Sequence, residues 1–146
     1  MGRRRKAREI ALQVLYQMDV TGGSPEEALD LFWRNFDAPE YARPFCTRLI
    51  EGTYEHLADI DGRIRGVSSN WSMERMAIVD RNILRMAVFE LLYCRDIPPK
   101  VAINEAIDLG KEFGTENSGS FINGILDALF GNLQDDHGHQ DIIGIG

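Results

Sequence analysis

The sequence predicts an all-α protein, with two small helical bundles that form one compact domain. Apolar residues recur along most of the chain at the three-to-four spacing of amphipathic helices, and proline or glycine interrupts that pattern at intervals. The chain has 146 residues, of which 44% are hydrophobic, so a single core is expected. We place the domain at residues 1–133, with helical halves at about 3–65 and 71–131.

The N-terminal segment from Arg3 to about Asp19 predicts one amphipathic helix. Arg5 and Tyr16 are eleven positions apart, which is about three helical turns, so they share the outer face of this helix. Arg8 lies at the margin of the opposite, apolar face. That apolar face is formed by Ala7, Ile10, Ala11, Val14, Leu15 and Met18.

Turn residues divide the next part of the chain. Ser24 and Pro25 predict the start of a short second helix, with Ser24 as its N-cap. A longer third helix is expected at about residues 40–64, where Gly52 allows either a close helix contact or a bend. The stretch 66–70, Gly-Val-Ser-Ser-Asn, is the expected linker between the two halves.

Two helical patterns joined by a proline hinge follow. The first covers residues 80–92 and ends before Pro98, and the second covers residues 101–114. Gly114 is expected to close the second helix in the left-handed conformation. Glu90 stands among apolar residues, and because an unpaired buried carboxylate is costly, we expect an arginine from another helix beside it.

The C-terminal part predicts one more helix and a tail. Asn117 or Ser118 is suited to cap a helix that contains Phe121 and ends near residue 131. Residues 134–146 show no hydrophobic period, so we expect a mobile acidic tail. Its two histidines, at 137 and 139, lack a fixed framework of ligands, and no metal site is expected there.

The charge distribution is uneven. The net charge is −7 and the pI is about 4.9, yet five cations fall within six positions near the N-terminus: Arg3, Arg4, Arg5, Lys6 and Arg8. One basic patch on an acidic protein suits a polyanion bound in a single place. Guanidinium groups bind phosphates and an exposed tyrosine stacks on unpaired bases, which favours single-stranded RNA. A solvated basic face is the alternative.

Other features of the sequence limit the class of protein. No apolar run is long enough to span a membrane and no signal-peptide core is present, so a cytoplasmic location is expected. Cys46 and Cys94 are isolated, which favours reduced structural thiols. We find no nucleophile beside a base, no spaced set of metal ligands and no phosphate-binding loop. We therefore expect a protein that is not an enzyme and needs no cofactor.

The C-terminal half contains a set of motifs: the run Val-Ala-Ile-Asn-Glu-Ala at 101–106, Phe113-Gly114, Ser118, Phe121 and Asn-Gly-Ile-Leu at 123–126. This set resembles the NusB family of bacterial transcription antitermination factors. Together with the arginine-rich segment, the resemblance covers residue 4 to about 129. It implies an all-helical protein that binds the boxA element of nascent ribosomal RNA leader transcripts with a small-subunit ribosomal protein, NusE. Such proteins help RNA polymerase read through terminators.

The resemblance also implies site residues. Asp80 and Arg85, on the charged side of the long helix, would meet the ribosomal protein. Phe121 would stack on a base if it is exposed, and otherwise belongs to the core. Asn117 departs from relatives that often carry an acid there, which should reduce repulsion of RNA. The RNA-binding residues would be Arg4, Arg5, Lys6, Arg8, Tyr16 and Phe121. The alternative to RNA binding is a homodimer that buries the arginine-rich face.

Overall fold

The computed structural model describes the backbone of residues 2–68 and 70–145, and side chains in this range up to Asp135. Within these residues the secondary structure is entirely helical, which confirms the predicted all-α class. The helices, in order, are α1 (Gly2–Thr21), α2 (Pro25–Asn35), η1 (Glu40–Ala42), α3 (Arg43–Glu55), α4 (Leu57–Val67), η2 (Met73–Arg75), α5 (Ile78–Tyr93), α6 (Pro99–Phe113) and α7 (Ser118–Ile145). The two elements marked η are single 3-10 turns.

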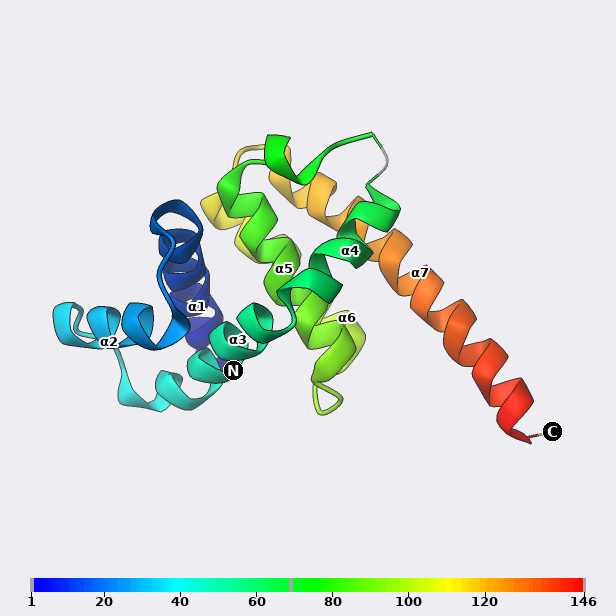
Figure 1. Ribbon diagram of the computed structural model, residues 1–146, viewed down its shortest axis with the longest axis horizontal. Helices are drawn as coiled ribbons and strands as arrows, with labels where there is room; N and C mark the ends of the chain where they lie inside the picture. The colour runs from blue at the N-terminus through cyan, green and yellow to red at the C-terminus, as the bar shows by residue number, and fades with distance from the viewer. Residues whose placement is uncertain (1, 69, 146) are drawn as a thin grey trace.

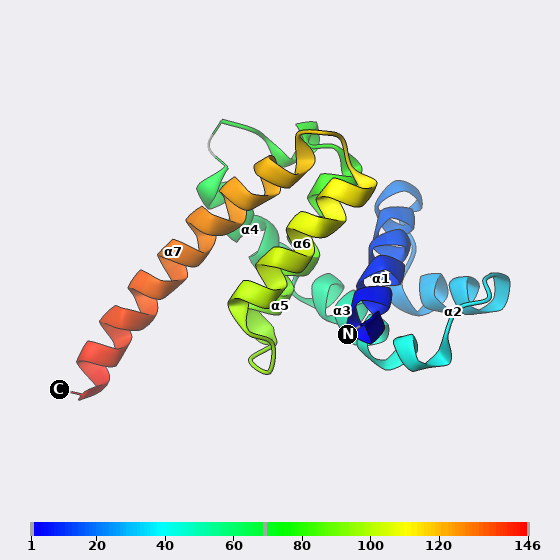
Figure 2. The same ribbon diagram turned by 180° about the vertical axis from the view of Figure 1, so that it is seen from behind.

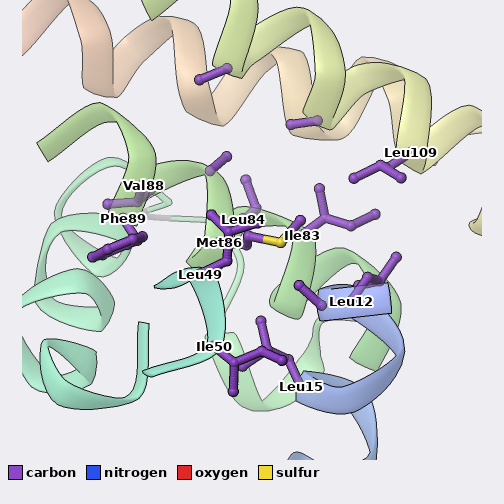
Figure 3. Packing of buried hydrophobic residues seen from close by; sticks show 14 of the residues in the cluster. Leu12, Leu15, Leu49, Ile50, Ile83, Leu84, Met86, Val88, Phe89 and Leu109 are labelled. Atoms are coloured by element: carbon purple, nitrogen blue, oxygen red, sulfur yellow. The ribbon is translucent and has the colours of Figure 1, made fainter. Parts of the chain in front are cut away.

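Helix α5 lies at the centre of the fold (Figure 1). It packs against α1, α3 and α4 from the N-terminal half and against α6 and α7 from its own half. This position explains its apolar sequence, because a helix covered on several sides needs apolar residues around most of its circumference. The core is continuous across both halves, and Figure 3 shows side chains from α1, α3, α5 and α6 within it.

The expected third helix is divided into η1, α3 and α4. The break between α3 and α4 falls at His56, which leaves the helical conformation with φ −104° and ψ 19°. Gly52 lies inside α3 and serves the other expected purpose, a close helix contact. The ring of Phe89 from α5 lies where a side chain at Gly52 would begin. Glycine at this position therefore sets how closely α3 approaches α5.

We expect Gly52→Ala to destabilise the fold by about 1–3 kcal/mol, because the added methyl group overlaps the buried Phe89 ring. Chemical denaturation measures this change in the free energy of unfolding. Gly62→Ala is the matched control, since Gly62 is also helical but has no atom within 4 Å of an added Cβ. That substitution should leave stability unchanged or raise it by up to about 1 kcal/mol. Equal effects at both glycines would contradict the packing role.

Some helix ends agree with the sequence and others differ. The Ser24 hydroxyl accepts a hydrogen bond from the Glu27 amide at 3.2 Å, as expected of an N-cap before Pro25. The left-handed prediction for Gly114 is wrong, since its φ is −96° and its ψ is −157°. A side chain is excluded there for another reason: an added Cβ would lie 2.6 Å from the Cβ of Ser118.

Helix α7 continues well past its expected end near residue 131 and reaches Ile145. Its C-terminal portion extends away from the other helices (Figures 1 and 2). The mobility of residues 134–146 stays a prediction. The side chains of His137 and His139 lie outside the described residues.

Further expectations concern the cysteines and membrane insertion. Cys46 and Cys94 are buried free thiols, as expected of structural cysteines. Burial raises the pKa of Cys46 to about 12 and that of Cys94 to about 11, so both thiols stay protonated at neutral pH. Among the described helices, none has the length and apolar character needed to cross a membrane.

Candidate nucleic-acid interface

The five N-terminal cations of α1 do not form one uniform basic surface. Arg3, Arg4 and Lys6 are exposed, Arg5 is half-buried and Arg8 is only 2% exposed. The difference follows from the helix geometry, because successive residues point in directions 100° apart. Each cation therefore meets a different set of neighbours.

Arg8 is buried in an ion pair with Glu90 of α5. Its Nη2 donates to Glu90 Oε1 at 2.6 Å, and its Nε lies 3.2 and 3.1 Å from the two carboxylate oxygens. The arginine expected beside Glu90 is thus confirmed. Burial raises the pKa of the Glu90 carboxyl, although the hydrogen bond from Arg8 acts in the opposite direction.

The assignment of Arg8 to a phosphate contact needs correction. The buried face of α1 is wider than the sequence pattern indicated, because Leu12, which was not placed on the apolar stripe, is also buried at 5% exposure. Arg8 lies one turn before Leu12 and so points into the same interior. With both carboxylate oxygens of Glu90 against its guanidinium group, Arg8 holds α1 to α5 and does not face solvent.

Arg4 lies beside the loop that joins α5 and α6. Its Nη2 is 3.2 Å from Oδ2 of Asp96, whose other oxygen accepts from Nη2 of Arg48 at 2.7 Å. The guanidinium group of Arg4 also lies over the ring of Phe45, 4.6 Å from its centroid. Hydrogen bonds from Arg48 hold the pKa of the Asp96 carboxyl well below its usual range, so this acid is ionised at neutral pH. Asp96 is thus shared by two arginines.

Arg5 is bound to α6. Its Nε lies 2.5 Å from Glu105, and its Nη2 lies 2.9 Å from Asp108. The close contact with Glu105 is the main reason that the pKa of Arg5 is raised. Glu105 belongs to the motif at 101–106, and its role in the described structure is this pairing with α1. A phosphate that binds Arg5 must compete with these two carboxylates.

Tyr16 and Lys6 lie together in a groove between α1, the start of α5 and the end of α6, which we call the tyrosine groove. Its volume is about 540 Å³. Tyr16 is 39% exposed, and Phe113, which also lines the groove, is 44% exposed. Phe113 belongs to the Phe113-Gly114 motif but is not among the site residues expected from the sequence. The groove is lined by Lys6, Glu9, Ile10, Leu12, Gln13, Tyr16, Val79, Glu112 and Phe113.

Phe121 does not line the tyrosine groove. It is half-buried near the start of α7 and packs against the core. Its amide donates to the carbonyl of Asn117 at 3.1 Å, so the first turn of α7 holds it in place. The residue is only partly buried, and its stacking on a base stays a prediction.

Asp80 and Arg85 point inward rather than along an exposed charged face. Arg85 donates from Nε and Nη2 to the two oxygens of Asp61, both at 2.9 Å, and its Nη1 lies 3.3 Å from Asp19. Asp80 is 8% exposed. Asp80 and Arg85 are thus largely covered, because the polar side of α5 packs against α1 and α4. Their contact with a partner protein stays a prediction.

Asp19, at the end of α1, belongs to the same network as Arg85. It accepts hydrogen bonds from Arg81 Nε at 3.0 Å and from Asn82 Nδ2 at 2.9 Å. Burial disfavours the charged form of Asp19, but these bonds outweigh burial and the pKa is lowered. Within the described residues, no group of three His, Cys, Asp or Glu side chains is placed to hold a metal ion.

Comparisons with known proteins agree with the motifs. The profile of the NusB family matches residues 5–130. A relative called transcription antitermination protein NusB, from Syntrophus aciditrophicus, is 58% identical over 142 residues, which cover 97% of this chain and 88% of the relative. A protein of the same name from Desulforapulum autotrophicum is 54% identical over 131 residues, covering 88% and 92% of the two chains.

Solved structures show the same fold. NusB of T. maritima is 38% identical and superimposes with a TM-score of 0.76 over 86% of this chain and 89% of its own. A chain in the crystal structure of antitermination factors NusB and NusE in complex with dsRNA is 29% identical, with a TM-score of 0.76 over 90% and 98% of the two chains. The family match spans most of the residues that build the helices and the tyrosine groove. The chain therefore belongs to the NusB family.

Proposed function

We propose that this protein is a transcription antitermination factor that binds the boxA element of nascent ribosomal RNA leader transcripts together with the ribosomal protein NusE. The observation that carries the proposal is the tyrosine groove, where Lys6 and Tyr16 meet in a chain of the NusB family. The relatives' shared name and the complex of NusB and NusE with RNA support this function. Its contact with RNA polymerase is indirect, and its place of action is the cytoplasm.

The preference for single-stranded RNA rests on the chemistry of the groove. A half-exposed aromatic ring stacks on a base only if that base is unpaired, whereas a phosphate contact from Lys6 is available on any strand. Tyr16 and Phe113 provide two such rings at one groove. Lys6, Arg3 and Arg4 provide positive charge along the N-terminal turns of α1.

The ion pairs of α1 predict modest affinity for RNA alone. Arg4 and Arg5 already contact Asp96, Glu105 and Asp108, so phosphates must replace or share these contacts. Each phosphate neutralised on a single strand contributes only about −0.7 to the log-log salt slope. A partner that adds its own contacts raises the affinity by thermodynamic coupling, typically about 5- to 150-fold. NusE is the proposed source of this coupling.

Tyr16→Ala should weaken RNA binding about tenfold, since loss of one stacked base costs about 1–3 kcal/mol. Fluorescence anisotropy with a labelled boxA-like RNA measures this change. Thermal unfolding should shift less than for a core substitution, because Tyr16 is 39% exposed. The matched control is Tyr54→Ala, which removes a tyrosine that is 50% exposed on α3. Similar affinity of the two variants would argue against stacking on Tyr16.

The overall test is a titration of the same RNA with this protein alone and then with NusE present. Partner-enhanced binding that depends on the boxA sequence supports the proposed function. If neither titration shows binding, the function is refuted. The homodimer that buries its basic face would be favoured if the molecular mass of the protein falls on dilution and if added RNA blocks dimerisation.

A further inference from the structure

A second groove lies between α1 and α2, and its lining carries no charged side chain. Its volume is about 280 Å³. Two half-exposed apolar side chains and one buried ring form much of its surface, and three primary amides come from the two helices. We call it the amide groove and define it by Gln13, Gln17, Leu31, Phe32, Asn35 and Phe36.

Phe36 provides the groove with a fixed aromatic ring. It is 53% exposed, although it lies directly after α2 and packs on that helix. Its ring stacks on Phe32, with centroids 4.8 Å apart and planes 17° apart. Phe32 is itself 7% exposed and belongs to the core. An aromatic ring held in this way loses little freedom when a planar ligand stacks on it.

The amides give the groove the hydrogen-bonding character of a base-reading site. A primary amide offers a donor and an acceptor side by side, the pattern that pairs with the edges of nucleobases. Asn35 Nδ2 donates to the Leu31 carbonyl at 2.8 Å, which orients this amide and leaves its oxygen as an acceptor. Gln13 and Gln17 are both exposed on α1. An aliphatic side chain from a protein would use none of these polar groups.

The amide groove adjoins the tyrosine groove along α1. Gln13 lines both, so the two share a wall on α1. At 100° per residue, Gln13 points between Tyr16 and Gln17. Gln17 is one turn beyond Gln13, which is roughly 6 Å along the helix axis. A strand that passes Tyr16 therefore reaches the amide groove without leaving α1.

We propose that the amide groove binds an unpaired nucleobase of the RNA that contacts Tyr16. The neutral lining fits a base and disfavours a phosphate, and the small volume suits one planar ring system rather than a helix of a partner protein. The base stacks on Phe36 and its edge hydrogen-bonds to the amides of α1 and α2. This inference rests on the proposed RNA-binding function and extends it to a specificity site.

The test is a scan of the boxA-like RNA with single abasic nucleotides, titrated against the full chain by anisotropy. The wild type is compared with Phe36→Leu, which removes the ring, and Gln17→Leu, which removes one exposed amide. Gln134→Leu is the matched control, because Gln134 is also an exposed amide but lies far along α7. Thermal unfolding of each variant verifies that it is folded at the temperature of the titration.

At one position, removal of the base is expected to lower the RNA affinity of the wild type about tenfold. The same removal should lower the affinity of Phe36→Leu less than about twofold. Gln17→Leu should reduce the cost at the same position, and Gln134→Leu should not. If the intact RNA binds the wild type but no position shows this non-additivity, the base site is refuted and RNA binding stands. If the intact RNA does not bind, both are refuted. The groove would instead bind a second copy of this chain if the wild type is a dimer that dissociates in Phe36→Leu and no abasic position shows non-additivity.

Discussion

Arg8→Met should lower the free energy of unfolding by about 3–5 kcal/mol, because it leaves the Glu90 carboxylate buried without its partner. Arg8 and Glu90 are each only 2% exposed, so water cannot replace the lost hydrogen bonds. Equilibrium denaturation at neutral pH measures the loss. RNA affinity of the protein that remains folded should change little, since Arg8 does not face solvent.

The pH dependence of the same variant provides a second readout. Burial raises the pKa of Glu90, and the variant removes the hydrogen bond from Arg8, which is the main effect that lowers this pKa. A carboxyl with a raised pKa in the folded state stabilises the fold most below its unfolded pKa of about 4.3, and this stabilisation is lost as the pH rises. The deficit of Arg8→Met relative to wild type should therefore shrink as the pH falls from about 7 to about 5.

The double variant Arg8→Met with Glu90→Leu is the control, and it should recover most of the stability because no buried charge remains. A double variant as unstable as Arg8→Met would show that packing of the arginine stem matters more than charge. A deficit that grows at lower pH would contradict the protonation argument.

Arg85→Met should lower the free energy of unfolding by about 2–3 kcal/mol, somewhat less than a fully buried pair. Arg85 is the partner of Asp61, whose side chain is 10% exposed, so its loss leaves that carboxylate poorly solvated. Asp19 keeps its hydrogen bonds from Arg81 and Asn82 and should be affected less. Denaturation at neutral pH measures the difference.

Arg34→Met provides the comparison for Arg85, because Arg34 pairs with Asp30 on the exposed face of α2. No measurable change is expected there, since exposed pairs at i and i+4 contribute little. NusE binding should be measured at a temperature at which Arg85→Met is folded. Intact binding under that condition would assign Arg85 to the fold alone, and lost binding would support the predicted partner contact.

The sequence predicted the parts of the fold that depend on local pattern. The apolar period of α1, the N-cap at Ser24 and the proline hinge before α6 are local features, and they appear in the structure. Glu90 was predictable as half of an ion pair because a buried carboxylate needs a cation. Which cation it meets was not predictable, because Arg8 lies 82 residues away.

The candidate site was predicted in part for the same reason. Lys6 and Tyr16 share one groove because both follow from the period of a single helix. The pairing of Arg5 with Asp108 joins residues 103 positions apart, and only the packing of α1 on α6 brings them together. The inward position of Arg85 likewise depends on Asp61 of α4. Long-range pairing determines which charges of this chain remain available to a ligand.

The central position of α5 has a consequence for how the protein unfolds. Because α5 belongs to the packing of both halves, neither half can lose its structure while the other keeps a complete core. The two halves should therefore behave as one cooperative unit. Backbone amides in α5 should exchange with solvent deuterium only through global unfolding, at the slowest rate in the chain. Separate exchange of the two halves would show that their shared helix does not couple them.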